Sequence, residues 1–241
     1  MPKYRIAEFN VELASKYDVL FDILIKEYKS DFEVADISFS IEDEDIINER
    51  KIDAGENEEL YDCSFALSAC LRKLAEKLIF HNAFVLHSAT FDVDGVGVSF
   101  AAHSGTGKTT HMNLWQELLG EKMTVVNGDK PIVRFFDDEP EQPYAYGTPW
   151  NGKEKLGCNM RTPLKHICFI ERSETNYVER LDKALAIDRI FNQVYMPKNP
   201  IAAMNTMKLI DRLLSCCNLW IIHCNMEKDA AKVAYETIFG K

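Results

Sequence analysis

The segment 96–119 constrains the fold of this chain more than any other part of the sequence. An apolar, β-branched run at 96–102 leads into Ser-Gly-Thr-Gly-Lys-Thr at 104–109, and a helical pattern continues over 108–119 and stops before Gly120. A strand that ends in a glycine-rich loop and opens a helix is the context in which a P-loop motif binds phosphate. The segment therefore predicts an α/β chain with a nucleotide site at this loop.

Each residue type in the loop has a chemical reason to be there. Glycines allow backbone N–H groups to close around phosphate oxygens, and the helix N-terminus adds partial positive charge. Lys108 is predicted to reach the β- and γ-phosphates of ATP, and the Thr109 hydroxyl to ligate Mg²⁺. The first position of the G-x-x-x-x-G-K-[ST] pattern is Ala102. The residues predicted to bind the nucleotide are Ser104, Gly105, Thr106, Gly107, Lys108, Thr109 and Thr110.

Strand and helix patterns alternate along the chain, which predicts a mixed α/β class. Strands are expected at 4–11, 34–41, 83–91, 96–102, 123–126, 165–171 and 219–223. Helices are expected at 19–28, 61–79, 108–119, 181–194, 201–216 and 227–239. The acidic stretch 42–59 is interpreted as a solvated loop. It divides a small N-terminal α/β lobe, 1–58, from a nucleotide-binding domain, 59–241.

Composition limits the classes of partner. The net charge of −10 gives no sign of the basic surface that nucleic acid attracts, so no nucleic-acid partner is expected. The seven cysteines include no C-x-x-C pair, which favours small core residues over disulfides or zinc. No run approaches the ~20 apolar residues of a membrane helix. A cytoplasmic protein without a membrane partner is expected.

Three further residues could take part in chemistry. Asp129 follows the strand 123–126 in Asn-Gly-Asp, where a Walker-B-type carboxylate would sit, although a plain turn aspartate is an equal alternative. His87 is placed late in the strand 83–91, where a core histidine is the commoner reading. The loop 146–155 holds Trp150, Lys153 and Glu154, and could close over a ligand with Trp150 shielding it.

Two stretches, Val85–Val98 and Ser104–Thr110, together resemble the catalytic domain of the bacterial HPr serine kinase/phosphorylase family. The Ser-Gly-Thr-Gly-Lys-Thr-Thr core is also similar to ATP-dependent phosphoenolpyruvate carboxykinase. The likeness covers roughly residues 83–172. It implies an HPr-kinase/carboxykinase-like P-loop core, a mixed sheet with flanking helices. A homo-oligomer is among the arrangements that the resemblance allows.

The resemblance also implies roles for individual residues. His87 would match the family's active-site histidine near the transferred phosphate. Asp129 would match the second of two paired aspartates, the catalytic acid/base, whereas Gly128 occupies the place of the first. That loss argues against a phosphorylase activity. Glu154 is the match for a further metal-ligating glutamate.

Three functions follow as hypotheses. The favoured one is an ATP-dependent kinase in which Asp129, His87 and Lys108 act on a hydroxyl acceptor, either a serine or threonine of a protein or peptide or a small hydroxyl compound. The main alternative is a non-catalytic ATP-binding sensor or partner-binding module. A carboxykinase is the third, and it is disfavoured because those enzymes are more than twice this length and need a second lobe.

Overall fold

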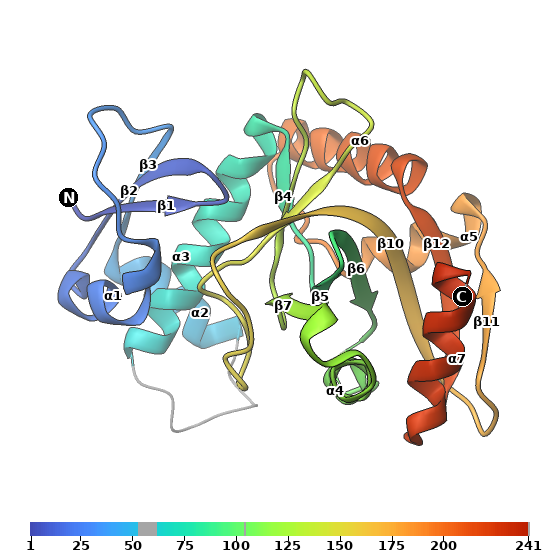
Figure 1. The fold of residues 1–241 in the computed structure, drawn as a ribbon. Coiled ribbons are helices and arrows are strands. Elements are labelled where there is room, and N and C mark those ends of the chain that lie inside the picture. Colours follow the sequence, from blue (N-terminus) through green and yellow to red (C-terminus); the bar gives the residue numbers. More distant parts are fainter. Residues whose placement is uncertain (53–61, 104, 241) are drawn as a thin grey trace. The chain divides into compact units, whose positions relative to one another are not determined.

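The computed structural model describes residues 1–52, 62–103 and 105–240, which form two compact units, Met1–His81 and Asn82–Lys241 (Figure 1). The division falls later in the chain than the boundary expected after residue 58. The reason is that helix α3 (Asp62–Leu78) packs against helix α2 (Asp43–Ile52) and strand β3 (Ile37–Ile41). Within the described residues, no helix is both long enough and apolar enough to cross a bilayer.

The first unit contains a three-stranded sheet in the order β1-β2-β3. Its other two strands are β1 (Lys3–Ile6) and β2 (Phe9–Ser15). The single strand expected at 4–11 is wrong, because Ala7 and Glu8 adopt left-handed backbone angles, φ 50° and 63°, and turn the chain back on itself. Two left-handed residues suit the twist of a hairpin, but glycine or asparagine is the usual signal for them. β2 then pairs in parallel with β3.

The remaining helices of this unit are α1 (Asp18–Leu24) and the short 3₁₀ turns η1 (Lys26–Tyr28) and η2 (Ile79–His81). The solvated loop expected at 42–59 is wrong for residues 43–52, which form α2. Its first turn carries Asp43, Glu44 and Asp45, and carboxylates at that end are favoured by the helix dipole. The acidic composition therefore stabilises a helix instead of a loop, while 53–59 lie outside the described residues.

The second unit is built on a nine-stranded mixed sheet. Its strands are β4 (Ala83–Val85), β5 (Ser88–Val93), β6 (Val96–Ala101), β7 (Met123–Asn127), β8 (Ile132–Arg134), β9 (Tyr144–Tyr146), β10 (Arg161–Arg172), β11 (Tyr177–Arg180) and β12 (Asn218–Cys224). The order is β4-β8-β9-β10-β6-β5-β7, and β12 lies between β10 and β11. β10 is the long curved strand of Figure 1: its start pairs antiparallel with β9, and its remainder pairs in parallel with β6 and β12.

The strand expected at 83–91 is broken in two at Leu86 and His87. β4 pairs with β8, whereas β5 pairs with β6 and β7. The backbone N–H of Leu86 donates to Pro131, and that of His87 donates to Gln193. His87 thus lies in a crossover between two strands and not within one. The short strands β8, β9 and β11 had no sequence prediction.

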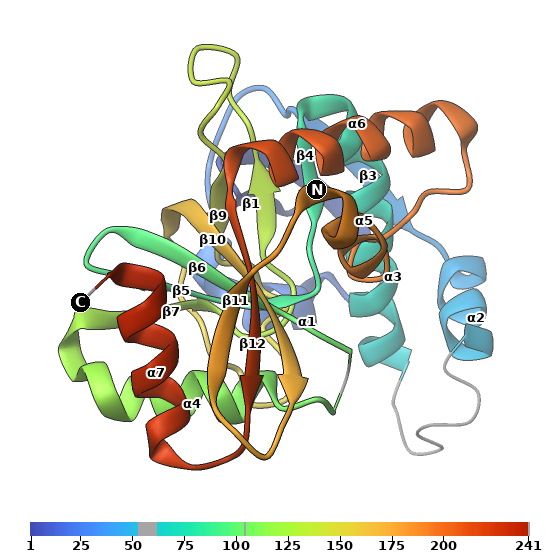
Figure 2. The same ribbon diagram turned by 90° about the vertical axis from the view of Figure 1, so that its right-hand side faces the viewer.

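Helices cover both faces of the sheet around the loop. They are α4 (Lys108–Leu119), α5 (Lys183–Phe191), α6 (Pro200–Cys216) and α7 (Lys228–Phe239). α4 and α7 lie side by side on one face in Figures 1 and 2. There Trp115 of α4 packs on Phe91 and Phe100, with ring centroids 5.3 and 5.6 Å away. This fully buried aromatic cluster fixes the start of α4 at the end of β6. On the opposite face, Arg189 of α5 covers Phe169.

None of the seven cysteines forms a disulfide within the described structure. Cys70, Cys168 and Cys224 are buried and the other four are half-buried. The expectation of small core residues holds for the three buried cysteines.

Candidate functional site

The loop between β6 and α4 has the backbone that its glycines predict. Gly105 and Gly107 have φ angles of +76° and +121°, in the left-handed region where a side chain is strained. The Thr106 N–H donates to the His103 carbonyl, 3.2 Å away, so this amide is used within the loop itself. Ser104 lies outside the described residues, and its predicted contact has no structural counterpart here.

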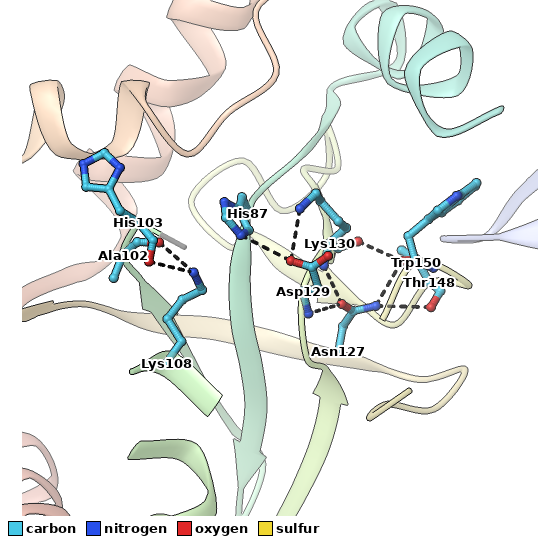
Figure 3. Close-up of polar contacts among 9 residues, drawn as sticks. All are labelled: His87, Ala102, His103, Lys108, Asn127, Asp129, Lys130, Thr148 and Trp150. Carbon is cyan, nitrogen blue, oxygen red and sulfur yellow. Dashed lines mark hydrogen bonds and ion pairs between the residues drawn. The ribbon is translucent and has the colours of Figure 1, made fainter. Parts of the chain in front are cut away.

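Lys108, the first residue of α4, is held against this loop (Figure 3). Its Nζ donates to the Ala102 carbonyl at 2.7 Å and to the His103 carbonyl at 3.4 Å. The side chain is buried, and burial lowers the pKa of the ammonium; the charge of Asp129 opposes that effect and the charge of Lys130 adds to it. Asp129 and Lys130 belong to the turn after β7, and this turn lines the same cavity as Lys108.

Asn127, the last residue of β7, fixes the conformation of that turn. Its Oδ1 accepts the backbone N–H groups of Asp129 and Lys130, at 2.9 and 2.7 Å. Its Nδ2 donates to the carbonyl and the hydroxyl of Thr148, at 3.2 and 3.0 Å (Figure 3). The Lys130 N–H also donates to the Trp150 carbonyl. The buried asparagine therefore ties the turn to the loop 146–155 and leaves little freedom for Asp129.

One oxygen of Asp129 carries both of its close charge contacts. Oδ1 lies 3.2 Å from His87 Nε2 and 3.0 Å from Lys130 Nζ (Figure 3). Burial raises the pKa of this carboxyl, but the hydrogen bond from His87 and the charge of Lys130 outweigh burial and lower the pKa to about 2. No described residue hydrogen-bonds Oδ2. Asp129 is thus an ionised carboxylate with one oxygen held in place and the other available to a ligand.

A cavity of about 520 Å³ lies between the loop and the turn. Its lining includes most of the predicted site: His87, Gly105, Gly107, Lys108, Thr109, Thr110, Asp129 and Glu154, together with Gly128, Lys130, Gly152 and Lys153. Thr106 is not among these residues. Nor is Trp150, which is buried and whose backbone carbonyl accepts the Lys130 N–H.

The oxygen donors in this cavity suit a metal that arrives with phosphate. The described residues contain no group of three or more His, Cys, Asp or Glu side chains able to hold a metal alone. Mg²⁺ is usually held by one or two carboxylates, waters and substrate phosphates. The Cγ of Asp129 and Oε2 of Glu154 both lie within 4 Å of the point where a Cβ on Gly152 would stand. These carboxylates and the Thr109 hydroxyl line the same space.

Three residues of the site had no prediction from the sequence. Asn127 and Lys130 flank Gly128 and Asp129, and an asparagine that opens a turn is a recognisable signal. Arg172, at the end of β10, donates to the carbonyls of Gly105 and Thr106 at 2.6 and 3.3 Å. No local pattern indicates this contact, since it depends on the pairing of β10 with β6.

No protein-family model and no curated protein matches the chain. Among solved structures, the chain is similar to the Hpr(Ser) kinase/phosphatase from Coxiella burnetii, with 8% sequence identity and a TM-score of 0.34. The alignment covers 65% of this chain and 93% of that one. A TM-score of this size does not establish a common fold.

Proposed function

We propose that this chain is an ATP-dependent kinase that transfers the γ-phosphate to a hydroxyl acceptor, a serine or threonine of a protein or peptide. The observation that carries the proposal is that Lys108, at the start of α4, and Asp129, in the turn after β7, line one cavity of about 520 Å³. A lysine that can reach phosphate oxygens and an ionised carboxylate that can accept a proton are two of the groups that phosphoryl transfer to a hydroxyl uses, together with Mg²⁺.

In this proposal the γ-phosphate lies between Lys108 and Asp129. Oδ2 of Asp129 accepts the proton of the acceptor hydroxyl. The oxygen of that hydroxyl then bonds to the γ-phosphorus, while the bond between the γ-phosphorus and the β,γ-bridging oxygen breaks and ADP is released. Lys108 turns from the loop carbonyls to the phosphate oxygens and offsets their charge. Mg²⁺, held by the Thr109 hydroxyl and the Glu154 carboxylate, would add further positive charge, and the free oxygen of Asp129 would stay available for the proton. His87 keeps Asp129 in position through Oδ1.

The low pKa of Asp129 fits this role. A loose phosphoryl-transfer transition state needs a well-placed acceptor more than a strong base. The network around Oδ1 supplies placement, because His87 and Lys130 hold that oxygen from two sides.

A non-catalytic ATP sensor is the second candidate, and Gly128 is the observation that favours it. A Cβ at this position would lie 3.1 Å from the Asn151 carbonyl oxygen and 3.3 Å from that of Leu156. An aspartate at position 128 would place its Cβ too close to both of these carbonyl oxygens. The turn therefore accommodates one carboxylate, that of Asp129. In the sensor, this single carboxylate would hold the Mg²⁺ of bound ATP, and no second carboxylate would serve as the base.

Transfer of label from [γ-³²P]ATP separates the two candidates. The purified chain with Mg²⁺ is incubated with a library of serine- and threonine-containing peptides and with a matched library that has alanine at those positions. The kinase proposal expects label in the first library only. ATP binding measured by calorimetry without label in peptide or phosphate would favour the sensor, and absence of ATP binding would contradict both.

A further inference from the structure

The glycines that allow the phosphate loop to form also leave its backbone weakly restrained. Gly105 and Gly107 both have positive φ angles, and a Cβ at either position would meet no other group within 4 Å. Both glycines line the cavity of about 520 Å³ and also a second cavity, of about 460 Å³. Little packing therefore holds the two peptide groups on either side of Thr106, and glycine permits more than one orientation of each.

Arg172, at the end of the neighbouring strand β10, holds both of these peptide groups. Its Nη2 donates to the Gly105 carbonyl at 2.6 Å, and its Nε donates to the Thr106 carbonyl at 3.3 Å. A trans peptide group directs its C=O and its N–H in opposite directions, so the N–H groups of Thr106 and Gly107 are turned away from the guanidinium. The Thr106 N–H accordingly donates to the His103 carbonyl. No described residue accepts a hydrogen bond from the Gly107 N–H.

The pairing of β10 fixes the place from which Arg172 reaches the loop. β10 pairs in parallel with β6, so its end lies beside the loop that follows β6. Arg172 lies opposite Cys224 of β12, and the N–H of Ser173 donates to the Cys224 carbonyl at 3.0 Å. The preceding residue, Glu171, forms an ion pair with Arg189. Within the described chain no carboxylate pairs with Arg172, so its guanidinium is available to the loop.

We propose that Arg172 is a positioning residue for the phosphate loop. It holds the Gly105 and Thr106 carbonyls away from the bound phosphates, so that backbone N–H groups face the phosphates instead. The inference rests on the proposed function, because it concerns the same nucleotide site. A carbonyl oxygen turned toward a phosphate would repel it, whereas an N–H attracts it. Arginine suits this task because its planar fork of donors can reach two neighbouring carbonyls at once.

Direct contact of Arg172 with the phosphates is the alternative, and the geometry disfavours it. Arg172 lines the second cavity and is not among the residues that line the first, where Lys108 and Asp129 lie. Both of its hydrogen bonds go to the loop backbone. Its effect on a phosphate is therefore expected to pass through the orientation of the loop.

The restraint itself can be tested without a nucleotide, by amide hydrogen exchange measured with NMR. The Thr106 amide should exchange about tenfold faster in Arg172→Met, which cannot donate, and at an intermediate rate in Arg172→Lys, which keeps a donor. Arg180→Met is the matched control. Arg180 is also exposed, donates to Asn218 Oδ1 at 2.8 Å and covers Trp220, but it lies outside both cavities. An unchanged Thr106 rate in Arg172→Met would overturn the inference.

Binding of inorganic tripolyphosphate with Mg²⁺ tests the consequence for phosphate. Arg172→Met should weaken it about tenfold in both about 0.1 M and about 1 M NaCl, because salt does not restore the orientation of the peptide groups. Arg180→Met should stay within about twofold of wild type. An exposed ion pair with phosphate would be screened, so a loss seen only at low salt would overturn the positioning role. Unchanged affinity in Arg172→Met would overturn it as well.

The two experiments also separate failure of this inference from failure of the proposed function. A wild-type chain that binds neither tripolyphosphate nor ATP would refute the nucleotide site, and with it any role of Arg172 in phosphate binding. A wild-type chain that binds both, together with an Arg172→Met variant that exchanges and binds like wild type, would refute the inference alone.

Discussion

The Nε2 atom of His87 lies 3.2 Å from the Oδ1 atom of Asp129, although the two residues follow different strands. Backbone contacts bring them together, because the Ser88 N–H donates to the Asp129 carbonyl and the His87 N–H to the Gln193 carbonyl. A backbone hydrogen bond next to the β5–β7 pairing therefore holds the two residues beside each other. The role of the Asp129 carboxylate and its pKa can therefore be tested with different variants.

Replacement of Asp129 by asparagine should separate binding from transfer. The amide keeps the size of the side chain but cannot accept the acceptor proton, so we expect phosphoryl transfer to fall by about 10²–10⁴ while ATP affinity changes only a few-fold. Labelled-ATP transfer and calorimetry measure the two quantities. The matched control, Asp138→Asn, alters an exposed aspartate and should change neither. Full transfer activity in Asp129→Asn would remove Asp129 from the mechanism.

Loss of Lys130 should raise the pKa of Asp129. Burial disfavours the ionised form of Asp129, and the Lys130 ammonium partly offsets this effect. Without the ammonium, the carboxyl therefore takes up a proton at a pH above about 2. Since transfer needs the ionised form, the acid limb of the pH–activity profile should move to higher pH by about one unit in Lys130→Met. Lys232→Met, on the exposed face of α7, is the control and should keep the wild-type profile. An unshifted acid limb in Lys130→Met would contradict the network.

Gly105 and Gly95 offer a matched pair for testing the loop. Both have positive φ, +76° and +86°, and neither would place a Cβ within 4 Å of another group. Each alanine variant should therefore lose a similar ~1–2 kcal/mol of unfolding free energy from backbone strain. Only Gly105→Ala should weaken ATP binding, by about tenfold or more, because Gly95 lies in the β5–β6 turn outside both cavities. Equal ATP affinities in the two variants would argue against a phosphate loop.

Two buried histidines predict how stability changes with pH. Burial lowers the pKa of His111 and of His166 from 6.5 to about 4, so each stays neutral in the folded state while the unfolded chain takes up a proton. The unfolding free energy should therefore fall as the pH decreases from about 6.5 to about 4, by up to about 1.4 kcal/mol per pH unit for each histidine.

Urea unfolding at several pH values measures this slope. His166→Phe should flatten it, whereas His81→Gln, which replaces an exposed histidine, should not. A slope that is the same in His166→Phe and wild type would contradict the assignment of a neutral buried ring.

The sequence by itself determined the local elements around the loop. The helix 108–119, the strand 96–102 and the glycine positions were predictable because each depends on residues adjacent in the chain: β-branched apolar residues for the strand, and glycine where the backbone is left-handed. The same locality explains why Asp129 was identifiable as a residue at the end of a strand. It also explains why Lys108 and Thr109 were predicted from the motif.

Only the tertiary structure decided what these elements meet. The break at His87, the contact of Arg172 with the loop and the second cavity all depend on which strands lie next to each other. That choice is made by burial of Phe91, Phe100 and Trp115 across the sheet and by long-range backbone hydrogen bonds, which leave no periodic pattern in the sequence. Neighbouring residues specify the parts of the site, while the packing of distant strands brings them together.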